Sequence, residues 1–129
     1  MPTHFTLKVR LNASAKEVYD AWLNSKKHSD MTGGQAIVSD KVKGKFSAWD
    51  GYIYGSNVEL IPNEKIVQSW RTAEFGDTDK VSLLEIKLKD TPKGCEITLS
   101  HSTIPDNQSD YESGWDKHYF QPMKKYFKK

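Results

Sequence analysis

The stretch that decides the fold is QSDYESGWDKHYFQPMKKYFKK (Gln108–Lys129), which follows a long run of predicted strands. Its large apolar residues return at spacings of three to four, which predicts a long helix with one apolar face. A helix of about 20 residues is about 30 Å long, enough to cross a small sheet. A helix with such a face, laid on a curved antiparallel sheet, leaves room for a cavity. The face consists of Tyr111, Trp115, His118, Tyr119, Pro122, Met123 and Tyr126.

Pro122 lies inside this predicted helix. Proline has no N–H to donate, and its ring presses against the preceding turn. The aromatic stripe nevertheless continues on both sides of the proline. We therefore expect a bend between His118 and Pro122, with the helix resuming through Tyr126. Ser109 and Glu112 have the spacing of a capping box at the start of the helix.

Two short helices are predicted near the amino terminus. Phe5–Leu11 alternates apolar and polar residues, as a half-buried strand does. A capping box at Ser14–Glu17 then begins the first helix. The second runs from Ser25 or Lys26 to about Met31, where a glycine pair ends it. The buried stripe of the first helix is Val18, Ala21 and Trp22.

Short strands then follow one another closely, joined by turns. Asp50–Gly51 has the composition of a two-residue type I′ hairpin turn. The element order predicts an α+β helix-grip fold: a curved antiparallel sheet of six to seven strands around one long C-terminal helix, with two short helices after the first strand. We expect a single domain over residues 1–129. The later strands are predicted at 36–38, 43–49, 52–61, 66–71, 81–89 and 95–102.

Composition narrows the function classes. Nineteen basic and 17 acidic residues leave a formal charge of +2, too balanced for a nucleic-acid-binding surface. Cys95 is the single cysteine, which excludes an internal disulfide and suits a reducing compartment. With no signal peptide and no membrane span in view, we expect a cytoplasmic protein. Histidine and cysteine lack metal-ligand spacing, so we predict neither a metal nor another cofactor.

Strand alternation predicts which side chains face the helix. On this register His101 also points inward, near the end of its strand. A buried imidazole needs a partner, which is either a structural hydrogen bond or a ligand group. The other inward-facing residues are Phe46, Ala48, Val58, Leu60, Leu84, Ile86, Leu88, Ile97 and Leu99.

Eight residues are candidates to line a cavity between sheet and helix. Their hydroxyl, imidazole and indole groups would orient an otherwise apolar ligand. Plain core packing is the alternative for each of them. No catalytic residue is predicted, because no nucleophile, base and orienting group fall together. The candidates are Trp49, Tyr54, Trp70, His101, Trp115, His118, Tyr119 and Met123.

Four segments resemble a known family: Ala15–Trp22, Asp50–Gly55, Ile61–Arg71 and Ser113–Phe120. The chain is similar to the C-terminal domain of the activator of the 90-kDa heat-shock-protein ATPase and to its stand-alone bacterial relatives. The resemblance implies a START-like, birch-pollen-allergen-like fold and a stress- or chaperone-related role. Members of this superfamily bind lipids, hormones or polyketides, and a minority are enzymes. Fold similarity alone does not identify the function.

Three functions follow, in this order. The first is a non-enzymatic module that binds a small hydrophobic or lipid-like molecule between sheet and helix. The second is a chaperone-interacting module that acts through its surface, which a narrow interior would favour. The third is a cyclase- or hydrolase-like enzyme that uses His101 or a tyrosine. Because the chain matches only the second domain of the eukaryotic activator, we expect weak or no chaperone binding and measurable uptake of a hydrophobic probe.

Overall fold

A computed structural model of the chain describes residues 3–49, 51–72, 82–104 and 114–127. In these residues six antiparallel strands form one sheet, in the order β1-β6-β5-β4-β3-β2. The strands are β1 (Thr3–Leu11), β2 (Lys45–Ala48), β3 (Ile53–Ile61), β4 (Lys65–Thr72), β5 (Ser82–Thr91) and β6 (Gly94–Ile104). The helical elements are α1 (Ala15–Trp22), α2 (Ser25–Thr32), the π-helical segment η1 (Asp116–Phe120) and α4 (Gln121–Tyr126).

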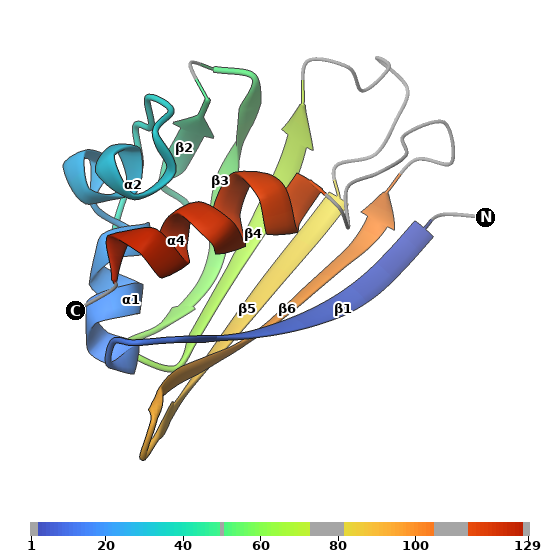
Figure 1. Cartoon of the computed structure of the whole chain (residues 1–129). Helices are drawn as coiled ribbons and strands as arrows, with labels where there is room; N and C mark the ends of the chain where they lie inside the picture. Colours follow the sequence, from blue (N-terminus) through green and yellow to red (C-terminus); the bar gives the residue numbers. More distant parts are fainter. Residues whose placement is uncertain (1–2, 50, 73–81, 105–113, 128–129) are drawn as a thin grey trace.

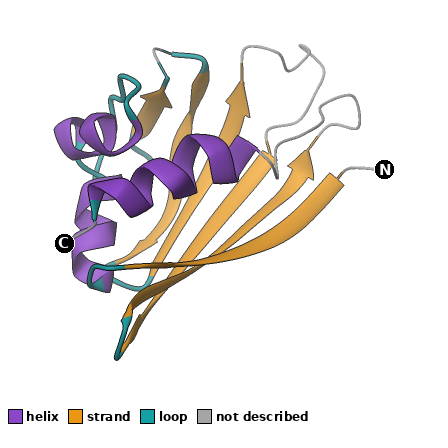
Figure 2. Cartoon of the chain, viewed as in Figure 1, coloured by secondary structure: helices purple, strands orange, loops and turns teal. Residues whose placement is uncertain are grey.

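The sheet curves around the C-terminal helix, and α1 and α2 lie at one end of it (Figure 1). In the part of the chain that the structure describes, the helices lie on one face of the sheet (Figure 2). Such a sheet buries alternate side chains of each strand, and along β5 Leu84, Ile86 and Leu88 are buried. The predicted α+β helix-grip fold is confirmed. The predicted inward positions that are buried are Phe46, Ala48, Leu84, Ile86, Leu88, Ile97, Leu99 and His101.

The two short helices begin where their capping residues predict. The Glu17 N–H donates to the Ser14 hydroxyl over 3.1 Å, and the Ser14 N–H donates to the Glu17 carboxylate over 3.1 Å. This reciprocal pair is the predicted capping box. The Ala15 N–H also donates to the Asp90 carboxylate over 2.7 Å, which ties the start of α1 to the end of β5. Gly33 ends α2 with a φ of 88°, a conformation that glycine adopts without strain.

The C-terminal helix contains one π-helical turn ahead of Pro122. The Gln121 N–H donates to the carbonyl of Asp116, five residues back, instead of the residue four back. Because Pro122 has no N–H, the α-helical ladder cannot run unbroken through this position. The helix resumes as α4 and ends at Tyr126, which confirms the predicted continuation. The predicted residues Gln108–Ser113, including the Ser109 cap, lie outside the described residues.

The β2–β3 hairpin has the register that a turn at Asp50–Gly51 predicts, because Ala48 pairs with Ile53 and the Tyr52 N–H donates to the Trp49 carbonyl over 3.2 Å. Asp50 itself lies outside the described residues, and the strands end at Ala48 and begin at Ile53, one residue short of the prediction on each side.

Trp49 has a φ of 52°, a left-handed conformation that bulky residues rarely adopt. Trp49 leaves the strand here, and its ring packs against His118 and Tyr119 of the C-terminal helix.

Two further corrections concern β3 and its surroundings. The pairing of β3 with β4 shifts between Asn57 and Glu59, which is a β-bulge. The extra residue interrupts the alternation after Asn57, which is buried, and Val58 is 50% exposed. The inward prediction for Val58 is therefore wrong, and Leu60 is only half-buried. The predicted strand at 36–38 is reduced to a single bridge between Ile37 and Ser47.

Candidate functional site

Aromatic rings fill much of the interior between the sheet and the C-terminal helix. Trp115 and Tyr119 of the helix meet Trp22 of α1 and Trp70 of β4, and all four are buried. The ring centroids of Trp115 and Tyr119 are 4.6 Å apart, and those of Trp22 and Tyr119 are 5.2 Å apart. Trp70 and Trp115 follow at 6.0 Å. These four residues are here called the aromatic cluster, and their centroid distances fall in the range of about 4.5–7 Å of interacting aromatic pairs.

His101 joins the cluster through an ordered chain of hydrogen bonds. The Trp115 indole N–H donates to His101 Nδ1 over 3.0 Å. An indole can only donate, so Nδ1 is the acceptor and Nε2 carries the proton. Nε2 then donates to the Ser82 hydroxyl over 2.8 Å, and that hydroxyl donates to the Trp70 carbonyl over 2.6 Å. Each hydrogen bond in the chain thus has one donor and one acceptor, and His101 is a hydrogen-bonded structural histidine.

This chain of donors decides what the histidine can do chemically. Burial lowers the pKa of His101 to about 3, so the ring is neutral at physiological pH. A protonated ring would also turn Nδ1 into a donor facing the Trp115 N–H. Activating Ser82 requires the hydroxyl to donate to the histidine, which is the reverse of the direction here. The arrangement therefore does not support the hydrolase-like hypothesis.

A second buried polar chain runs from α1 across the sheet. The Trp22 indole N–H donates to Gln68 Oε1 over 3.2 Å, and Gln68 Nε2 donates to Asn57 Oδ1 over 2.9 Å. Asn57 Nδ2 then donates to the carbonyls of Ser39 and Lys41 over 2.8 and 2.9 Å. Asn57 points inward because it keeps the alternation of Ile53 and pairs with Gln68, ahead of the bulge. These amides fix α1 and the 39–41 loop to the same two strands.

His28 of α2 is the second buried histidine, and sequence reasoning did not select it. Its Nδ1–H donates to the Trp22 carbonyl over 2.9 Å, which leaves Nε2 as a buried lone pair without a hydrogen-bond partner in the described structure. Burial lowers the pKa of His28, and the bond to Trp22 opposes part of that shift. Its ring packs on Trp22 and Tyr119 with centroids 4.8 and 5.9 Å apart.

Trp49 and His118 lie at the edge of the aromatic cluster. The half-buried Trp49 ring meets the exposed His118 ring edge to face, with centroids 5.6 Å apart, and contacts Tyr119 at 6.3 Å. Gly34 permits this position, because a Cβ there would lie 2.3 Å from the Trp49 ring. Burial raises the pKa of the Tyr119 hydroxyl, although a hydrogen bond from Trp49 opposes the shift.

Tyr54 does not join the other candidates. Its side chain is 42% exposed, whereas that of its neighbour Ile53 is buried. It lies between Ser47 of β2 and Arg71 of β4 on the sheet face away from the helix. Tyr54 follows the inward-facing Ile53 ahead of the bulge at Asn57, so its side chain points to the opposite face. The structure thus brings together Trp70, His101, Trp115 and Tyr119, adds Met123 beside them, and leaves Tyr54 outside.

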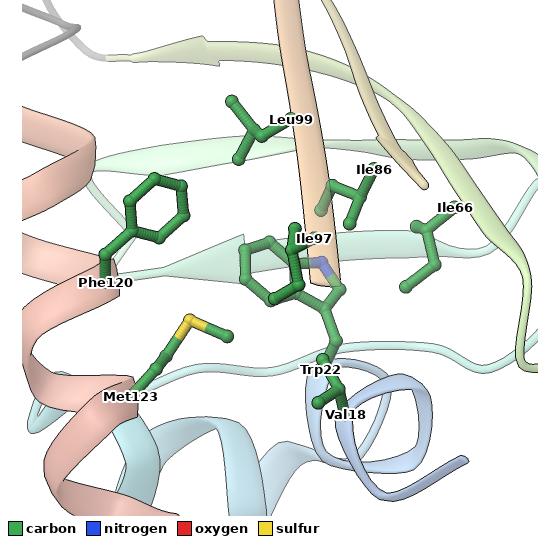
Figure 3. A pocket seen from close by; sticks show the side chains of 8 residues that line it. All are labelled: Val18, Trp22, Ile66, Ile86, Ile97, Leu99, Phe120 and Met123. Carbon is green, nitrogen blue, oxygen red and sulfur yellow. The ribbon is translucent and has the colours of Figure 1, made fainter. Parts of the chain in front are cut away.

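A small apolar cavity remains beside the aromatic cluster, as Figure 3 shows. Its volume is about 10 Å³, close to the minimum that holds one water molecule, and its lining offers no polar group to bind one. Pockets for small molecules usually measure about 300–1,000 Å³. Met123 is the one predicted cavity residue that lines it. The full lining is Val18, Trp22, Ile66, Ile86, Ile97, Leu99, Phe120 and Met123.

Other kinds of site find little support in the described residues. No group of three or more histidine, cysteine or acidic side chains there could hold a metal ion. Burial raises the pKa of the Cys95 thiol to about 11, so it is not a nucleophile at neutral pH. Glu59 and Glu85 pair with Lys65 on the outer face of the sheet, over 3.0 and 3.7 Å. No helix among the described residues is long and apolar enough to cross a membrane.

A curved antiparallel sheet closed over one C-terminal helix defines the helix-grip class of proteins. Within that class, residues 12–128 match the family described as "Activator of Hsp90 ATPase homolog 1-like protein", and the chain belongs to this family. The resemblance read from the four sequence segments is therefore confirmed.

Curated relatives carry the same name. The chain is 28% identical over 129 residues to the "Activator of 90 kDa heat shock protein ATPase homolog" of Dictyostelium discoideum, covering 98% of this chain and 34% of that protein. It is 24% identical over 123 residues to homolog 1 of Homo sapiens, covering 95% and 36%. The chain thus spans about a third of the length of these relatives.

Solved structures share the fold. An HSP90 activator from Plasmodium falciparum superposes with a TM-score of 0.79 at 22% identity, over 94% of this chain and 91% of that one. The Aha1 dimer from Colwellia psychrerythraea has a TM-score of 0.76 at 11% identity, over 97% and 93%. At these identities the likeness concerns the fold alone.

Proposed function

We propose that this chain is a non-enzymatic module that contacts a chaperone of the Hsp90 class through its surface. Family membership supports the identity of the partner. The observation that ranks surface contact above ligand binding is the part of the interior that the described residues enclose, where a cavity of about 10 Å³ remains beside the helix. This reverses the order in which the sequence placed the two functions.

The contact is expected to be weak. A domain of this size offers about 800 Å² to a partner, enough for a transient complex. The formal charge of +2 gives little long-range attraction to speed the encounter. We expect no more than a small effect of this weak contact on the chaperone's ATPase rate. Buried, unpaired Cys95 fits the reducing cytoplasm in which we place this encounter.

Two measurements test the chaperone contact. Calorimetric titration of a purified Hsp90-class chaperone should give weak, saturable binding, and ATP turnover measured alongside should change little. An unrelated protein of similar size and charge is the control. Absence of binding at the highest concentration that can be reached would remove the proposal.

Ligand binding is the second candidate, because the flexible Met123 is part of the wall of the small apolar cavity. Methionine is flexible and fills irregular gaps, so a hydrophobic or lipid-like molecule could displace this side chain and enter between helix and sheet. A fluorescent fatty acid tests this, with Met123→Ala as the variant that enlarges the cavity. Tighter probe binding by the variant supports the candidate. Strong probe binding by the native chain without chaperone binding would restore ligand binding to first place.

A further inference from the structure

The sheet has two edge strands, and they differ in how far their outer sides are covered. Along β2, Ile37 and Ser47 exchange two backbone hydrogen bonds of 2.9 and 2.8 Å, which cover part of this short strand. The nine-residue β1 lies at the opposite edge (Figure 2). Among the described residues, the backbone of β1 bonds to β6 alone. About half of its N–H and carbonyl groups therefore point outward, where another strand could pair with them.

The inward side of β1 is incompletely covered. Val9 and Leu11 are 8% and 1% exposed, whereas Phe5 and Leu7, nearer the start of the strand, are only half-buried. A further strand beside β1 would place its own inward side chains directly opposite these two residues. A partner strand with apolar residues at every second position would therefore bury apolar surface that β1 leaves in contact with water.

β1 itself has the alternation that such a partner needs. Leu7 is the central residue of the strand, so a second copy of β1 can pair with it antiparallel over its full length, about a two-fold axis at Leu7. On the inward face Leu7 then lies opposite Leu7 of the second copy, and Phe5 lies opposite Val9 of the second copy. The register shift near the start of β1 inserts its extra residue into β6, so the alternation of β1 is unbroken.

The outward face of β1 sets the cost of this pairing, because lysines on an edge strand discourage it. In the register centred on Leu7, Lys8 lies opposite Thr6 of the second copy, and Arg10 lies opposite His4 of the second copy. The two Lys8 residues are diagonal neighbours, with backbones about 7–8 Å apart. The Debye length at physiological ionic strength is about 8 Å, so salt screens much of their repulsion.

We propose that β1 pairs with β1 of a second copy of this chain, antiparallel about Leu7, and joins the two sheets into one continuous sheet. Backbone hydrogen bonds hold the two strands together, and the inward apolar rows fix their register. A contact along one strand is smaller than the roughly 800 Å² per partner of a standard interface, so the dimer is weak. The inference does not depend on the proposed function, because the contact needs no chaperone.

Opposite charges introduced at Thr6 test both the dimer and its register. Residue 6 of each copy faces Lys8 of the other copy, so Thr6→Glu creates two opposite-charge pairs and Thr6→Lys creates two like-charge pairs. Both variants lose the 3.2 Å hydroxyl contact with Ser100, and Ser100→Ala is the control for that loss. Gln35→Glu and Gln35→Lys make the same changes in net charge at an exposed residue near the β2 side of the sheet.

Sedimentation equilibrium of the full chain over a series of concentrations measures the dimer dissociation constant. We expect a weak monomer–dimer equilibrium for the native chain. Thr6→Glu should dimerise about tenfold more tightly and Thr6→Lys about tenfold more weakly, while Ser100→Ala and both Gln35 variants stay close to native. The native dimer should tighten as salt rises, because the two Lys8 residues repel each other less. Thermal unfolding checks that every variant folds.

Three results would overturn the inference. The first is a native chain that stays monomeric at the highest concentration that remains in solution, even if Thr6→Glu pairs. The second is a dimer whose dissociation constant does not depend on the sign of the charge at residue 6, because it would form through another surface. The third is a native dimer that weakens as salt rises. None of these results bears on the chaperone titration, so the proposed function is decided separately.

Discussion

The Trp115 indole N–H donates a 3.0 Å hydrogen bond to Nδ1 of His101, and this one contact determines the tautomer of a buried histidine. It also joins the C-terminal helix to the sheet through a polar bond inside an aromatic cluster. A buried acceptor that loses its donor is destabilising, so the two residues depend on each other.

The pKa of His101 predicts that stability falls in mild acid. The pKa is about 3 in the folded chain and has its ordinary value of 6.5 in the unfolded chain. Between these two pH values the histidine is therefore protonated in the unfolded chain but not in the folded chain. Stability from this group is complete above the unfolded pKa and is lost as the pH falls toward the folded pKa. We expect a loss of about 2 kcal/mol between pH 7 and pH 5, measured by urea unfolding. The lowered pKa of His28 acts in the same direction.

The His101→Gln variant isolates this effect. Glutamine can accept from Trp115 and donate to Ser82, so the chain of bonds can persist without a titrating group. Its stability should depend less on pH than that of the native chain. His4→Gln, at an exposed histidine, is the control and should keep the native slope. If the unfolding free energy of His101→Gln fell with pH as steeply as that of the native chain, the pKa of His101 would not differ between the folded and unfolded states.

Truncation of Trp115 separates packing from hydrogen bonding. Trp115→Ala should lower the unfolding free energy by about 3–5 kcal/mol, because the ring is buried among three others. Trp115→Phe keeps an aromatic ring but leaves His101 Nδ1 without its donor, which costs about 1–3 kcal/mol. Denaturant titration measures both. If Trp115→Ala lost under about 1 kcal/mol, the ring would line a yielding pocket instead of a packed interior.

Tyr54 and Tyr119 should respond very differently. The sequence made both candidates to line the cavity, whereas the structure exposes Tyr54 and buries Tyr119. Tyr119→Ala should cost about 3–5 kcal/mol, as for other buried aromatic rings. Tyr54→Ser should change the unfolding free energy by less than about 0.5 kcal/mol. Comparable losses at the two positions would place Tyr54 in the interior after all.

A substitution at Gly34 tests how tightly the Trp49 ring is held in place. The Cβ of Gly34→Ala would fall 2.3 Å from the Trp49 ring, so the ring must move. We expect a loss of about 1–3 kcal/mol from overpacking and a change in tryptophan emission. Gly33→Asn is the matched control, because space around Gly33 is open and asparagine tolerates its positive φ. Unchanged emission in Gly34→Ala would mean that the ring is already free to shift.

Sequence periodicity was sufficient for the fold and for part of the site. Alternation along β6 placed His101 inward, and the helical stripe placed Trp115 and Tyr119 over the sheet. Alternation fails where a strand gains a residue, which is why the Val58 side chain, next to the bulge at Asn57, points outward instead of inward. The left-handed backbone conformation of Trp49 could not be predicted either, because it depends on packing against residues that are distant in the sequence.

No sequence pattern could predict how much space remains between the sheet and the helix. The first-helix stripe predicted that Trp22 is buried, but no local signal pairs it with Trp115 or with the amide of Gln68. A cavity is what remains after such rings have packed, so it depends on their mutual geometry. His28 was missed for a related reason, since its burial comes from Trp22 and Tyr119 and not from its own short helix.

The pairing of β1 with β6 has a consequence for synthesis on the ribosome. Phe5 lies opposite His101, and Leu11 lies opposite Cys95, so β1 is paired by a strand that is made much later. At about 5–20 residues per second, β1 waits about 5–20 seconds for its partner. During that interval an alternating apolar strand has an open edge, which is a template for wrong pairing. The emerging chain is then itself a short-lived substrate for whatever binds extended apolar segments.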